Sequence, residues 1–363
     1  MAEREQIGPN GLGFLLFGFL MGSSLLLPMG AQAKEAAWIA TLLGGTASLG
    51  LAWIYARLAR AYPGESLVGC TQRILGRWLG GLVTLLYIWF GLHLASLVLR
   101  NFGEFLVTSL LPTTPISVLI IVLMLLCVYA VRHGLEPLAR TAQILTVTVI
   151  ALVSVTAFML TPEAEGQNLL PVMGGGLPSI LRAAVTVMAF PFGETVLFGM
   201  IFHRVRPKGS VFPTLSRSIL AATLVLALVT LLGTAVLGAH IRGVSRYATL
   251  AVIRQVMIAD FITNLDAVVI GAWVFTGFLK VSACLYITAS SVAELIGSVD
   301  FRPLLLPLGV IAASLSMLVY EDSSQMAAFL AVWPIYSAPF QLFMPLLLLG
   351  ASRFRRGSHS ANS

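Results

Sequence analysis

Charged residues are scarce in this sequence, where Asp, Glu, Lys and Arg make up 10% of 363 residues. Typical soluble domains contain about 25% charged residues, so this scarcity excludes a soluble globular enzyme. Hydrophobic residues make up 58% of the chain, and its mean hydropathy is +0.93. A helix of about 20 apolar residues crosses a hydrocarbon core of about 30 Å, and about ten such helices would use most of the chain. The composition therefore predicts an all-α, polytopic membrane protein.

Cysteines are few, and the common catalytic motifs are absent. The three cysteines, Cys70, Cys127 and Cys284, lie far apart, which excludes a disulfide framework and a Cys-x-x-Cys metal pair. The sequence has no His-Glu-x-x-His motif, no phosphate-binding loop of the Walker type and no nucleophile elbow. We therefore expect no enzyme activity, no metal and no cofactor.

Basic residues outnumber acidic ones by 22 to 15, which gives a net charge of +7. They are scattered over short connections between apolar runs and do not gather on one face, so a nucleic-acid partner is not expected. Membrane proteins concentrate Lys and Arg on the cytoplasmic side. Most of the basic residues, including those within 57–77, 204–217 and 353–356, fall on one side if the N-terminus is inside. We therefore expect both termini in the cytoplasm.

Apolar runs separated by polar residues or by Pro and Gly predict ten spans in one membrane domain that covers residues 1–363. An Ala-x-Ala pattern at 31–33 resembles a signal-peptidase site. A signal peptide begins with a positively charged region, and Glu3 and Glu5 mean that this N-terminus lacks one. The first apolar run is therefore expected to be a span. The predicted spans are 10–29, 37–57, 79–106, 115–131, 141–160, 179–202, 216–238, 264–290, 303–320 and 325–350.

Two connections between the predicted spans are unusually long. Residues 161–178 contain no Lys or Arg and join two halves of five spans each, about 10–160 and about 179–350, with a short basic cytoplasmic tail at 351–363. Residues 240–264 carry apolar side chains at helical spacing among charged ones, which predicts an amphipathic helix that rests on the membrane surface or acts as a lid.

The first and sixth spans are interrupted at matching places. A five-helix unit inverts when it is repeated, and transporters built this way break one helix in each half. Proline removes a backbone donor and glycine tolerates non-helical dihedral angles, and unwound backbone at membrane depth is tolerated only around a cavity. The paired breaks therefore predict a ligand site at the midplane. They contain Gly22, Ser23, Ser24 and Leu25 in the first span, and Phe190, Pro191, Phe192, Gly193, Glu194 and Thr195 in the sixth.

Several short motifs run through nearly the whole chain in a fixed order. They are Tyr62-Pro63-Gly64-Glu65-Ser66-Leu67, Leu75-Gly76-Arg77-Trp78-Leu79-Gly80, Leu111-Pro112-Thr113-Thr114-Pro115, Gly134-Leu135-Glu136-Pro137-Leu138-Ala139-Arg140, Pro191-Phe192-Gly193-Glu194, and Trp273 to Phe278 leading to Lys280. In this order, and within a ten-span frame, they resemble the spore germination permeases, the GerAB-type B subunits of nutrient germinant receptors. That family is related to the amino acid/polyamine/organocation transporters.

The resemblance implies a fold, a location and partners. It implies ten helices of the leucine-transporter type, a 5+5 inverted repeat in which helices 1 and 6 are broken. It also implies a protein of the spore inner membrane that senses a small nutrient such as an amino acid. The family's B subunit works with a larger membrane-anchored A subunit and a lipoprotein C subunit.

Two ionisable residues lie deep in predicted spans, where an unpaired charge is costly. Glu194 either contacts the ligand or forms a structural ion pair. Lys280 lies in the eighth span and shares a helical stripe with Thr276. In leucine-transporter relatives this helix packs against the unwound first helix, where sodium-dependent members hold a cation. A fixed ammonium there predicts sodium-independent function, while a stabilising pair with Glu194 is the alternative.

The third span carries His93, Arg100 and Glu104 on one helical face that runs toward the outer mouth. His93 either lines the pocket or is a buried histidine with satisfied hydrogen bonds. Arg100 and Glu104 either pair at the outer interface or form an external gate. The aromatic residues expected either to wall an apolar pocket or merely to pack are Trp89, Trp273, Phe190 and Phe192.

The backbone after the first break supplies further candidate groups, because the start of a resumed helix presents unpaired amides to a carboxylate. The full set of candidate ligand-binding residues is Gly22, Ser23, Ser24, Leu25, His93, Phe190, Phe192, Gly193, Glu194, Thr195 and Thr276.

Three functions fit this pattern. The first is a permease-like receptor subunit that binds a small nutrient at the midplane and signals germination through its partner subunits. The second is a sodium-independent, proton-coupled amino acid transporter. The third is a passive membrane scaffold, which explains the fold but leaves Glu194 without a role. Sensing and transport both require different affinities for two conformations, so the residue pattern supports both.

Overall fold

The computed structural model describes residues 5–207, 210–255, 265–321 and 323–360. Within these residues the chain is helical, apart from turns and a single β-bridge between Ile7 and Val205. Backbone hydrogen bonds inside a helix leave no polar group unsatisfied in lipid, which is why an apolar chain of this composition adopts helices.

Seven helical stretches of the described chain are long and apolar enough to cross a membrane, and three shorter apolar helices accompany them. Together they occupy the positions of the ten predicted spans. The first five spans contain α1 (Pro9–Met21), α2 (Ala37–Ala61), α3 (Leu67–Ser109), α4 (Ile116–Arg132) and α5 (Leu135–Leu160). The second five contain α6 (Gly176–Ala189), α7 (Val211–Val244), α9 (Leu265–Ile296), α10 (Arg302–Leu318) and α11 with α12 (Ser323–Ala338 and Met344–Ser360).

Helix ends differ from the prediction where a glycine bends the chain without ending the helix. The α3 helix begins at Leu67 and not near residue 79, because Gly76 at φ +82° joins a short helix to the span. Gly238 at φ +74° in the same way carries α7 past its predicted end. Glycine adopts this left-handed region without a Cβ penalty.

The two long connections are also ordered in part. Residues 161–178 contain two 3₁₀ turns, Thr161–Glu163 and Gly166–Leu169, and Glu165 N donates a hydrogen bond of 3.1 Å to Ala235 O in α7. In the predicted amphipathic segment, α8 (Ala248–Gln255) is a helix, while residues 256–264 lie outside the described residues.

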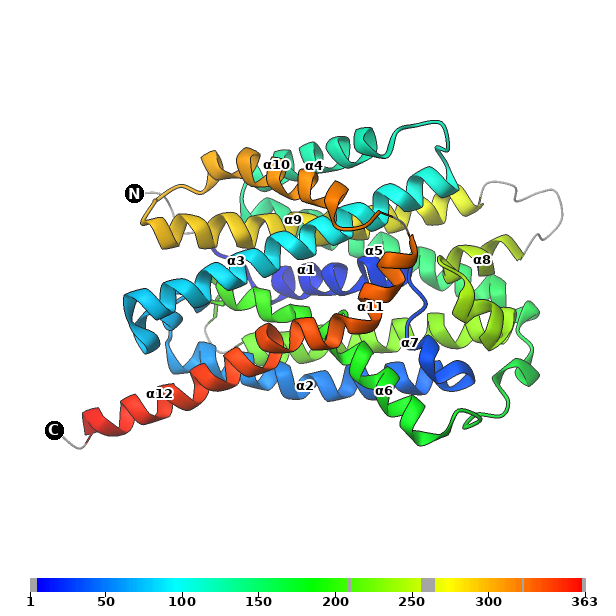
Figure 1. The fold of residues 1–363 in the computed structure, drawn as a ribbon, viewed down its shortest axis with the longest axis horizontal. Coiled ribbons are helices and arrows are strands. Elements are labelled where there is room, and N and C mark those ends of the chain that lie inside the picture. Colours follow the sequence, from blue (N-terminus) through cyan, green and yellow to red (C-terminus); the bar gives the residue numbers. More distant parts are fainter. Residues whose placement is uncertain (1–4, 208–209, 256–264, 322, 361–363) are drawn as a thin grey trace.

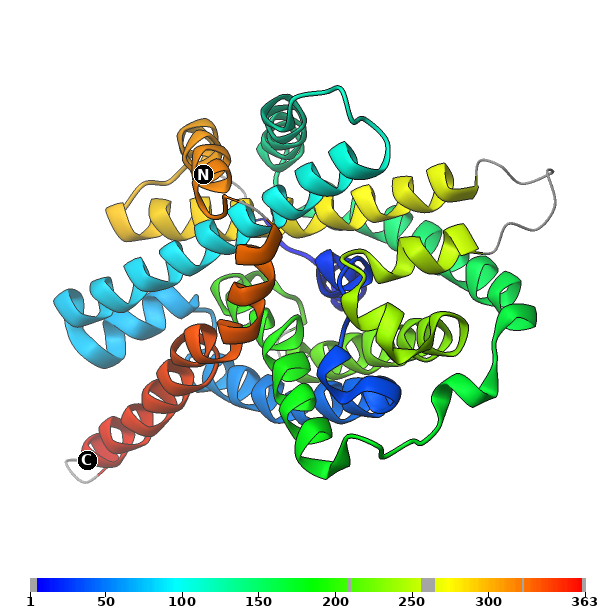
Figure 2. The ribbon, with the colours of Figure 1, turned by 45° about the vertical axis from the view of Figure 1, so that its right-hand side comes forward.

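The α1 helix lies inside the bundle, where it contacts α5, α7 and α9. The α2 helix packs on α6 and α7, and α3 packs on α9 and α10. Both chain ends lie at one end of the bundle, and α8 lies at the other, as Figure 1 shows. We call these the terminal end and the α8 end. The predicted tail from residue 351 continues α12 to Ser360, and this helix extends away from the body in Figures 1 and 2.

Candidate functional site

The first span is broken at Gly22. The α1 helix ends at Met21, and Gly22 leaves helical geometry at φ −7° and ψ −122°. The chain then forms only one 3₁₀ turn, Ser23–Leu25. The sequence predicted that a helix resumes here, and this part of the prediction is wrong: Pro28 and Gly30, at φ +65°, follow too soon for an α-helix to form.

The sixth span is broken at Phe190 and Pro191. The α6 helix ends at Ala189, and Phe190 is extended at φ −132° and ψ 117°. A nine-residue 3₁₀ helix, η5 (Phe192–Met200), continues the span. The predicted paired interruption of the two spans is therefore present.

A buried ion pair links the second break to α9. The Lys280 Nζ lies 2.6 Å from Glu194 Oε2, and both side chains are fully buried. The ammonium also lies 5.0 Å from the ring centre of Phe19 and 4.9 Å from that of Phe190. These rings belong to the first and sixth spans, so Lys280 contacts both broken helices.

Gly22 lets the Lys280 side chain pass close to the first break. A Cβ at Gly22 would lie 2.5 Å from Lys280 Cδ, which no real contact allows. Nearby, Thr276 Oγ1 donates to Trp273 O at 2.8 Å and lies 3.5 Å from Gly22 O. Lys280, the residue predicted to replace a cation between the first and eighth spans, therefore lies beside the first break, and its ammonium makes the predicted alternative pair with Glu194.

A small cavity of about 30 Å³ lies between the two breaks, with Ser23, Phe190 and Glu194 in its lining. We call it the midplane cavity. It has room for one or two waters, since a water needs about 10–15 Å³ by this measure. Its other walls come from α3, from the segment that contains α11 and from Leu27 after the first break. They are formed by Leu27, Leu94, Leu97, Val98, Asn101, Tyr320, Met326, Phe329, Leu330 and Trp333.

Three polar atoms in the lining of the midplane cavity have no hydrogen-bond partner within the described part of the chain. They are Ser23 Oγ, Asn101 Oδ1 and Glu194 Oε1, and all three are buried. Buried polar atoms are almost always hydrogen-bonded, so three such atoms around one cavity point to a missing partner. Two of them, the amide and the carboxylate oxygens, can only accept hydrogen bonds.

An aromatic cluster stands behind the α11 wall. His93 Nδ1 lies 2.8 Å from Tyr336 OH, and the imidazole stacks on Trp89 and meets the edge of Phe329. His93 itself does not belong to the cavity lining. It contacts Phe329, which lines the cavity.

The second break is held by groups that sequence reasoning missed. Gln341, in a π-helical turn at Pro339–Phe343, donates to Ala189 O at 2.9 Å. Tyr55 OH donates to Gln341 O at 2.7 Å and to Gly193 O at 3.3 Å. Tyr55 and Gln341 thus satisfy carbonyls that the break frees, and a π turn is often found at a functional site. A glutamine in an apolar span was the available signal for Gln341.

The remaining predicted residues are placed as follows. Ser24 Oγ donates to Leu20 O at 2.7 Å, and Thr195 Oγ1 to Phe192 O at 2.7 Å, so both bond to their own span. Leu25 O accepts from Thr249 Oγ1 of α8 at 2.6 Å. Other predicted residues that are buried but do not line the midplane cavity are Phe192, Gly193 and Trp273.

Charged side chains tie α3 to neighbouring segments at the α8 end. Arg100 Nε lies 2.6 Å from Glu104 Oε1, the pair that the sequence predicted. Arg246, which precedes α8, also pairs with Glu104. Arg254 Nη2 donates to Ser109 O at 3.3 Å. These contacts close the α8 end over the first break.

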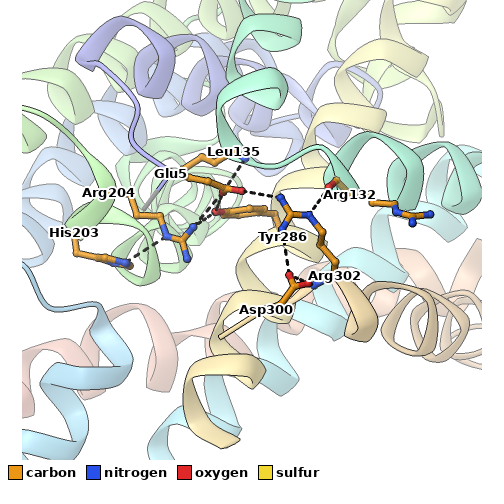
Figure 3. Close-up of polar contacts among 8 residues, drawn as sticks. All are labelled: Glu5, Arg132, Leu135, His203, Arg204, Tyr286, Asp300 and Arg302. Atoms are coloured by element: carbon orange, nitrogen blue, oxygen red, sulfur yellow. Dashed lines mark hydrogen bonds and ion pairs between the residues drawn. The ribbon is translucent and has the colours of Figure 1, made fainter. Parts of the chain in front are cut away.

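A second network closes the terminal end, and Figure 3 shows it around the Glu5 carboxylate. Glu5 Oε2 accepts from Tyr286 OH at 2.7 Å, from Leu135 N at 3.1 Å and from Arg204 at 3.2 Å. Arg302 Nη2 lies 3.7 Å from Glu5 Oε1. The carboxylate joins α5, α9, α10 and the end of the sixth span, beside a polar cavity of about 960 Å³. The sequence did not predict this role.

Comparisons with known proteins agree with this architecture. A family model described as spore germination protein matches residues 6–326. Spore germination protein KB of Bacillus subtilis (strain 168) is 32% identical over 351 residues, which are 95% of this chain and 94% of that protein. Spore germination protein GerQB of Bacillus cereus is 22% identical over 296 residues, 80% of this chain and 81% of that protein.

Solved structures of transporters share the fold. Mhp1, a nucleobase-cation-symport-1 family transporter in a closed conformation with bromovinylhydantoin bound, has a TM-score of 0.73 at 12% identity and covers 95% of this chain and 78% of its own. MhsT in complex with L-phenylalanine has a TM-score of 0.66 at 13% identity, with 93% and 87% covered. The predicted leucine-transporter type of fold is confirmed. Spore germination proteins of this family are not enzymes, so the expectation that this chain is not an enzyme is confirmed too.

Proposed function

This chain belongs to the spore germination protein family, and we propose that its midplane cavity binds a small nutrient, in the simplest case an amino acid. The resemblance carried by its sequence motifs is confirmed, and the chain is a permease-like integral membrane subunit of the germinant-receptor type. Binding of the nutrient would signal germination through partner subunits of the A and C types. The membrane would be the spore inner membrane, with both termini in the cytoplasm.

The observation that carries the proposal is the set of unpartnered atoms in the midplane cavity. Ser23 Oγ, Asn101 Oδ1 and Glu194 Oε1 line one small space, and each lacks a hydrogen-bond partner among the described residues. An orphaned buried polar atom costs about 1–3 kcal/mol, so a ligand that satisfies all three gains affinity and specificity together. A purely structural cavity would have apolar or paired walls.

The lining favours an ammonium group on an apolar body. The Asn101 and Glu194 oxygens accept hydrogen bonds, and a carboxylate adds charge, so a ligand ammonium suits this corner. The Ser23 hydroxyl can donate to a ligand carboxylate. Phe190, Phe329 and Trp333 provide apolar contact for a side chain. An α-amino acid with an apolar side chain carries these three features.

The cavity as it stands is too small for an amino acid, so binding requires one wall to move. The α11 wall is the candidate, because it contributes Met326, Phe329 and Leu330 and its neighbour, the π turn at Pro339–Phe343, is a weak point in the helix. Movement of α11 on binding would change the surface that α11 and α12 offer to a partner subunit. This couples occupancy of the cavity to signalling.

We also propose that function does not depend on sodium. The Lys280 ammonium lies between the rings of Phe19 and Phe190 and pairs with Glu194, so a fixed positive charge already joins the first, sixth and eighth spans. A sodium ion in the same place would meet this charge and be repelled. Equal nutrient sensitivity in sodium and potassium buffers is the expected result, and a steep rise with sodium alone would contradict it.

The proposal is tested by deleting the gene in the spore-forming organism that encodes it. Germination of the spores and uptake by growing cells are then scored across amino acids, sugars and nucleosides. Loss of germination to one nutrient with uptake intact supports the receptor function and identifies the ligand class. Loss of uptake with normal germination overturns it and favours a proton-coupled amino acid transporter, which the same broken helices and buried Glu194 would serve.

A further inference from the structure

Arg242 is a buried cation at the α8 end, outside the midplane cavity. The α7 helix bends at Gly238, and Arg242 follows on the last turns before α8. Its side chain folds back over the span, where a Cβ at Gly233 would lie 3.5 Å from the Arg242 Nε. The residue is 5% exposed. A guanidinium this deeply buried needs compensation for its lost hydration.

Only neutral oxygens within the described residues compensate Arg242. Its Nη2 donates to Met29 O at 2.8 Å and lies 3.5 Å from Thr230 Oγ1. A guanidinium carries five N–H donors, so most of them remain for another group. No described carboxylate lies within ion-pair distance of Arg242, in contrast to Arg100 and Arg204. Buried arginines are normally paired, which makes this site incomplete.

Arg242 lines a cavity of about 40 Å³, which we call the Arg242 cavity. Its polar lining consists of Arg242 and the hydroxyl groups of Ser24, Thr156, Thr230 and Thr249. The other lining residues are apolar, apart from Gly233, and no acidic side chain is among them. An ammonium would find no counter-ion here, so the cavity suits an anion and not a zwitterionic amino acid.

The partly exposed side of the Arg242 cavity lies mostly on two spans. Most of its partly exposed lining residues belong to α5 and α7: Leu152, Val153, Ala157, Val229 and Leu232. In a membrane protein the outer surface of two spans is covered by acyl chains, so a molecule enters this site from the bilayer. The volume of about 40 Å³ has room for about three waters, so it admits a group of the size of a carboxylate, and the apolar rim continues as a surface for a hydrocarbon chain.

We propose that the Arg242 cavity binds the anionic head group, a carboxylate or a phosphate, of an amphiphile supplied by the bilayer. Arginine recognises both groups with two parallel N–H donors. The head group completes the pairing of Arg242, and the hydrocarbon chain lies along the groove between α5 and α7. The two sources of this chemistry are a free fatty acid and an anionic phospholipid.

The site also touches the first break. Ser24 and Leu25 line the Arg242 cavity, Arg242 holds Met29 O, and Thr249 holds Leu25 O. Ser23, one residue away, lines the midplane cavity. An amphiphile in the Arg242 cavity therefore stabilises the closed arrangement of the α8 end and of the segment after Gly22.

The test is photolabelling of the purified, delipidated full chain in detergent with a diazirine-bearing palmitate. We expect the label on peptides of α5 and α7, with competition by palmitate, by phosphatidylglycerol or by both, and no competition by hexadecanol or phosphatidylcholine. Competition by palmitate alone identifies a fatty acid, and by phosphatidylglycerol alone a phospholipid. Equal competition by hexadecanol overturns the proposal, because the groove then binds hydrocarbon chains regardless of the charge of their head group.

Variants distinguish the contribution of the Arg242 charge to labelling from that of the apolar groove. Arg242→Gln should reduce labelling about tenfold, the loss expected when a charged hydrogen bond is removed, and Arg242→Lys should retain part of it. Arg217→Gln, which neutralises an exposed arginine of α7 that bonds within its own helix and does not line the cavity, is the matched control and should label like the wild type. Val153→Trp fills the rim and should block labelling with Arg242 intact, which covers the case in which Arg242→Gln misfolds. Wild-type labelling in Arg242→Gln and in Val153→Trp contradicts the site.

Discussion

At the scale of single residues, charge in the middle of the membrane is the feature that organises this chain. Glu194 and Lys280 are both fully buried and form a pair of 2.6 Å that joins the sixth and eighth spans. A buried pair contributes little net stability, because desolvation opposes the attraction. Removal of only one of the two side chains is costly, because the other charge then remains buried without a partner.

The pair makes a stability prediction. Lys280→Met should destabilise the protein by roughly 3–5 kcal/mol, since it strands the Glu194 carboxylate. Glu194→Leu should have a similar cost for the opposite reason. The double variant removes both charges and should recover most of the loss. Thermal unfolding of the purified proteins in detergent measures this. A double variant whose loss equals the sum of the two single losses would show that the two side chains act independently.

Neighbouring serines make a prediction about the ligand. Ser23 Oγ lines the midplane cavity without a partner among the described residues, whereas Ser24 Oγ bonds to Leu20 O. Ser23→Ala should raise the nutrient concentration for half-maximal germination about twofold to tenfold, the effect of about 0.5–1.5 kcal/mol in one hydrogen bond. Ser24→Ala is the matched control and should keep the wild-type concentration. Dose–response curves of spores carrying each variant decide, and a larger effect at Ser24 would contradict the site.

The charged residues of the site and Ser23, which lies at the first break, were predictable from the sequence, and the two amide side chains were not. Glu194 and Lys280 are conspicuous because a charge in an apolar run is rare. Asn101 and Gln341 give a weaker signal, since amides occur in spans for many reasons, and only the fold brings them to the two breaks. Arg242 lies in the 240–264 segment, which was predicted as a surface helix or lid, and no sequence pattern indicated the bend at Gly238 that buries it.

At the scale of elements, the first span shows how glycine positions the site. A Cβ at Gly22 would lie 2.5 Å from Lys280 Cδ and 3.0 Å from Phe19 O. The lysine side chain can shift, but the carbonyl belongs to α1 and cannot. Because Gly22 has no Cβ, α1 can end there, the span can break, and the Lys280 side chain can pass close to the backbone.

Gly22→Ala should therefore destabilise the protein by about 1–3 kcal/mol, the usual cost of overpacking. Gly50→Ala is the control, because Gly50 is exposed in the interior of α2 and a Cβ there meets no atom within 4 Å. That substitution should leave stability equal or slightly higher, by up to about 1 kcal/mol. Unfolding temperatures of the two variants test the contrast. Equal changes at both positions would mean that Gly22 does not pack against Lys280 as described.

Element existence was predictable, and element ends were less so. Long apolar runs gave the ten spans, since hydropathy alone selects them. The helix predicted after Gly22 is one 3₁₀ turn, because Pro28 and Gly30 limit its length. The extension of α3 back to Leu67 depends on Gly76 adopting a positive φ, a property that the residue type permits and does not impose.

At the scale of the whole molecule, the bundle is closed at both ends around the midplane cavity. Arg246 and Glu104 join α3 to the segment before α8 at one end, and Glu5 joins four segments at the other. A sensor or a transporter needs to open at least one of them. At the terminal end, a single carboxylate accepts hydrogen bonds from Arg204, Tyr286 and Leu135, so one substitution can weaken the whole network.

Glu5→Gln should therefore open the terminal end more often. The amide keeps the size of the side chain but loses the charge that attracts Arg204 and Arg302, so the closed state is weakened. A cysteine at Ser23 reports access to the midplane cavity, since the native cysteines are buried. Its reaction with a charged thiol reagent should become about tenfold faster in Glu5→Gln, a change of about 1.4 kcal/mol in the opening equilibrium.

The prediction also specifies the side of the membrane from which the thiol reagent reaches the cysteine at position 23. In vesicles of either orientation, the faster reaction should occur only with reagent on the side of the terminal end, because the Arg246 and Glu104 contact still closes the other. Glu163→Gln, at an exposed carboxylate in the 161–178 connection, is the control and should leave the rate unchanged. Arg246→Gln should give the mirror result, with faster reaction from the α8 side. Acceleration from both sides in Glu5→Gln would mean that Glu5 supports the fold as a whole and does not act as a closure of one end.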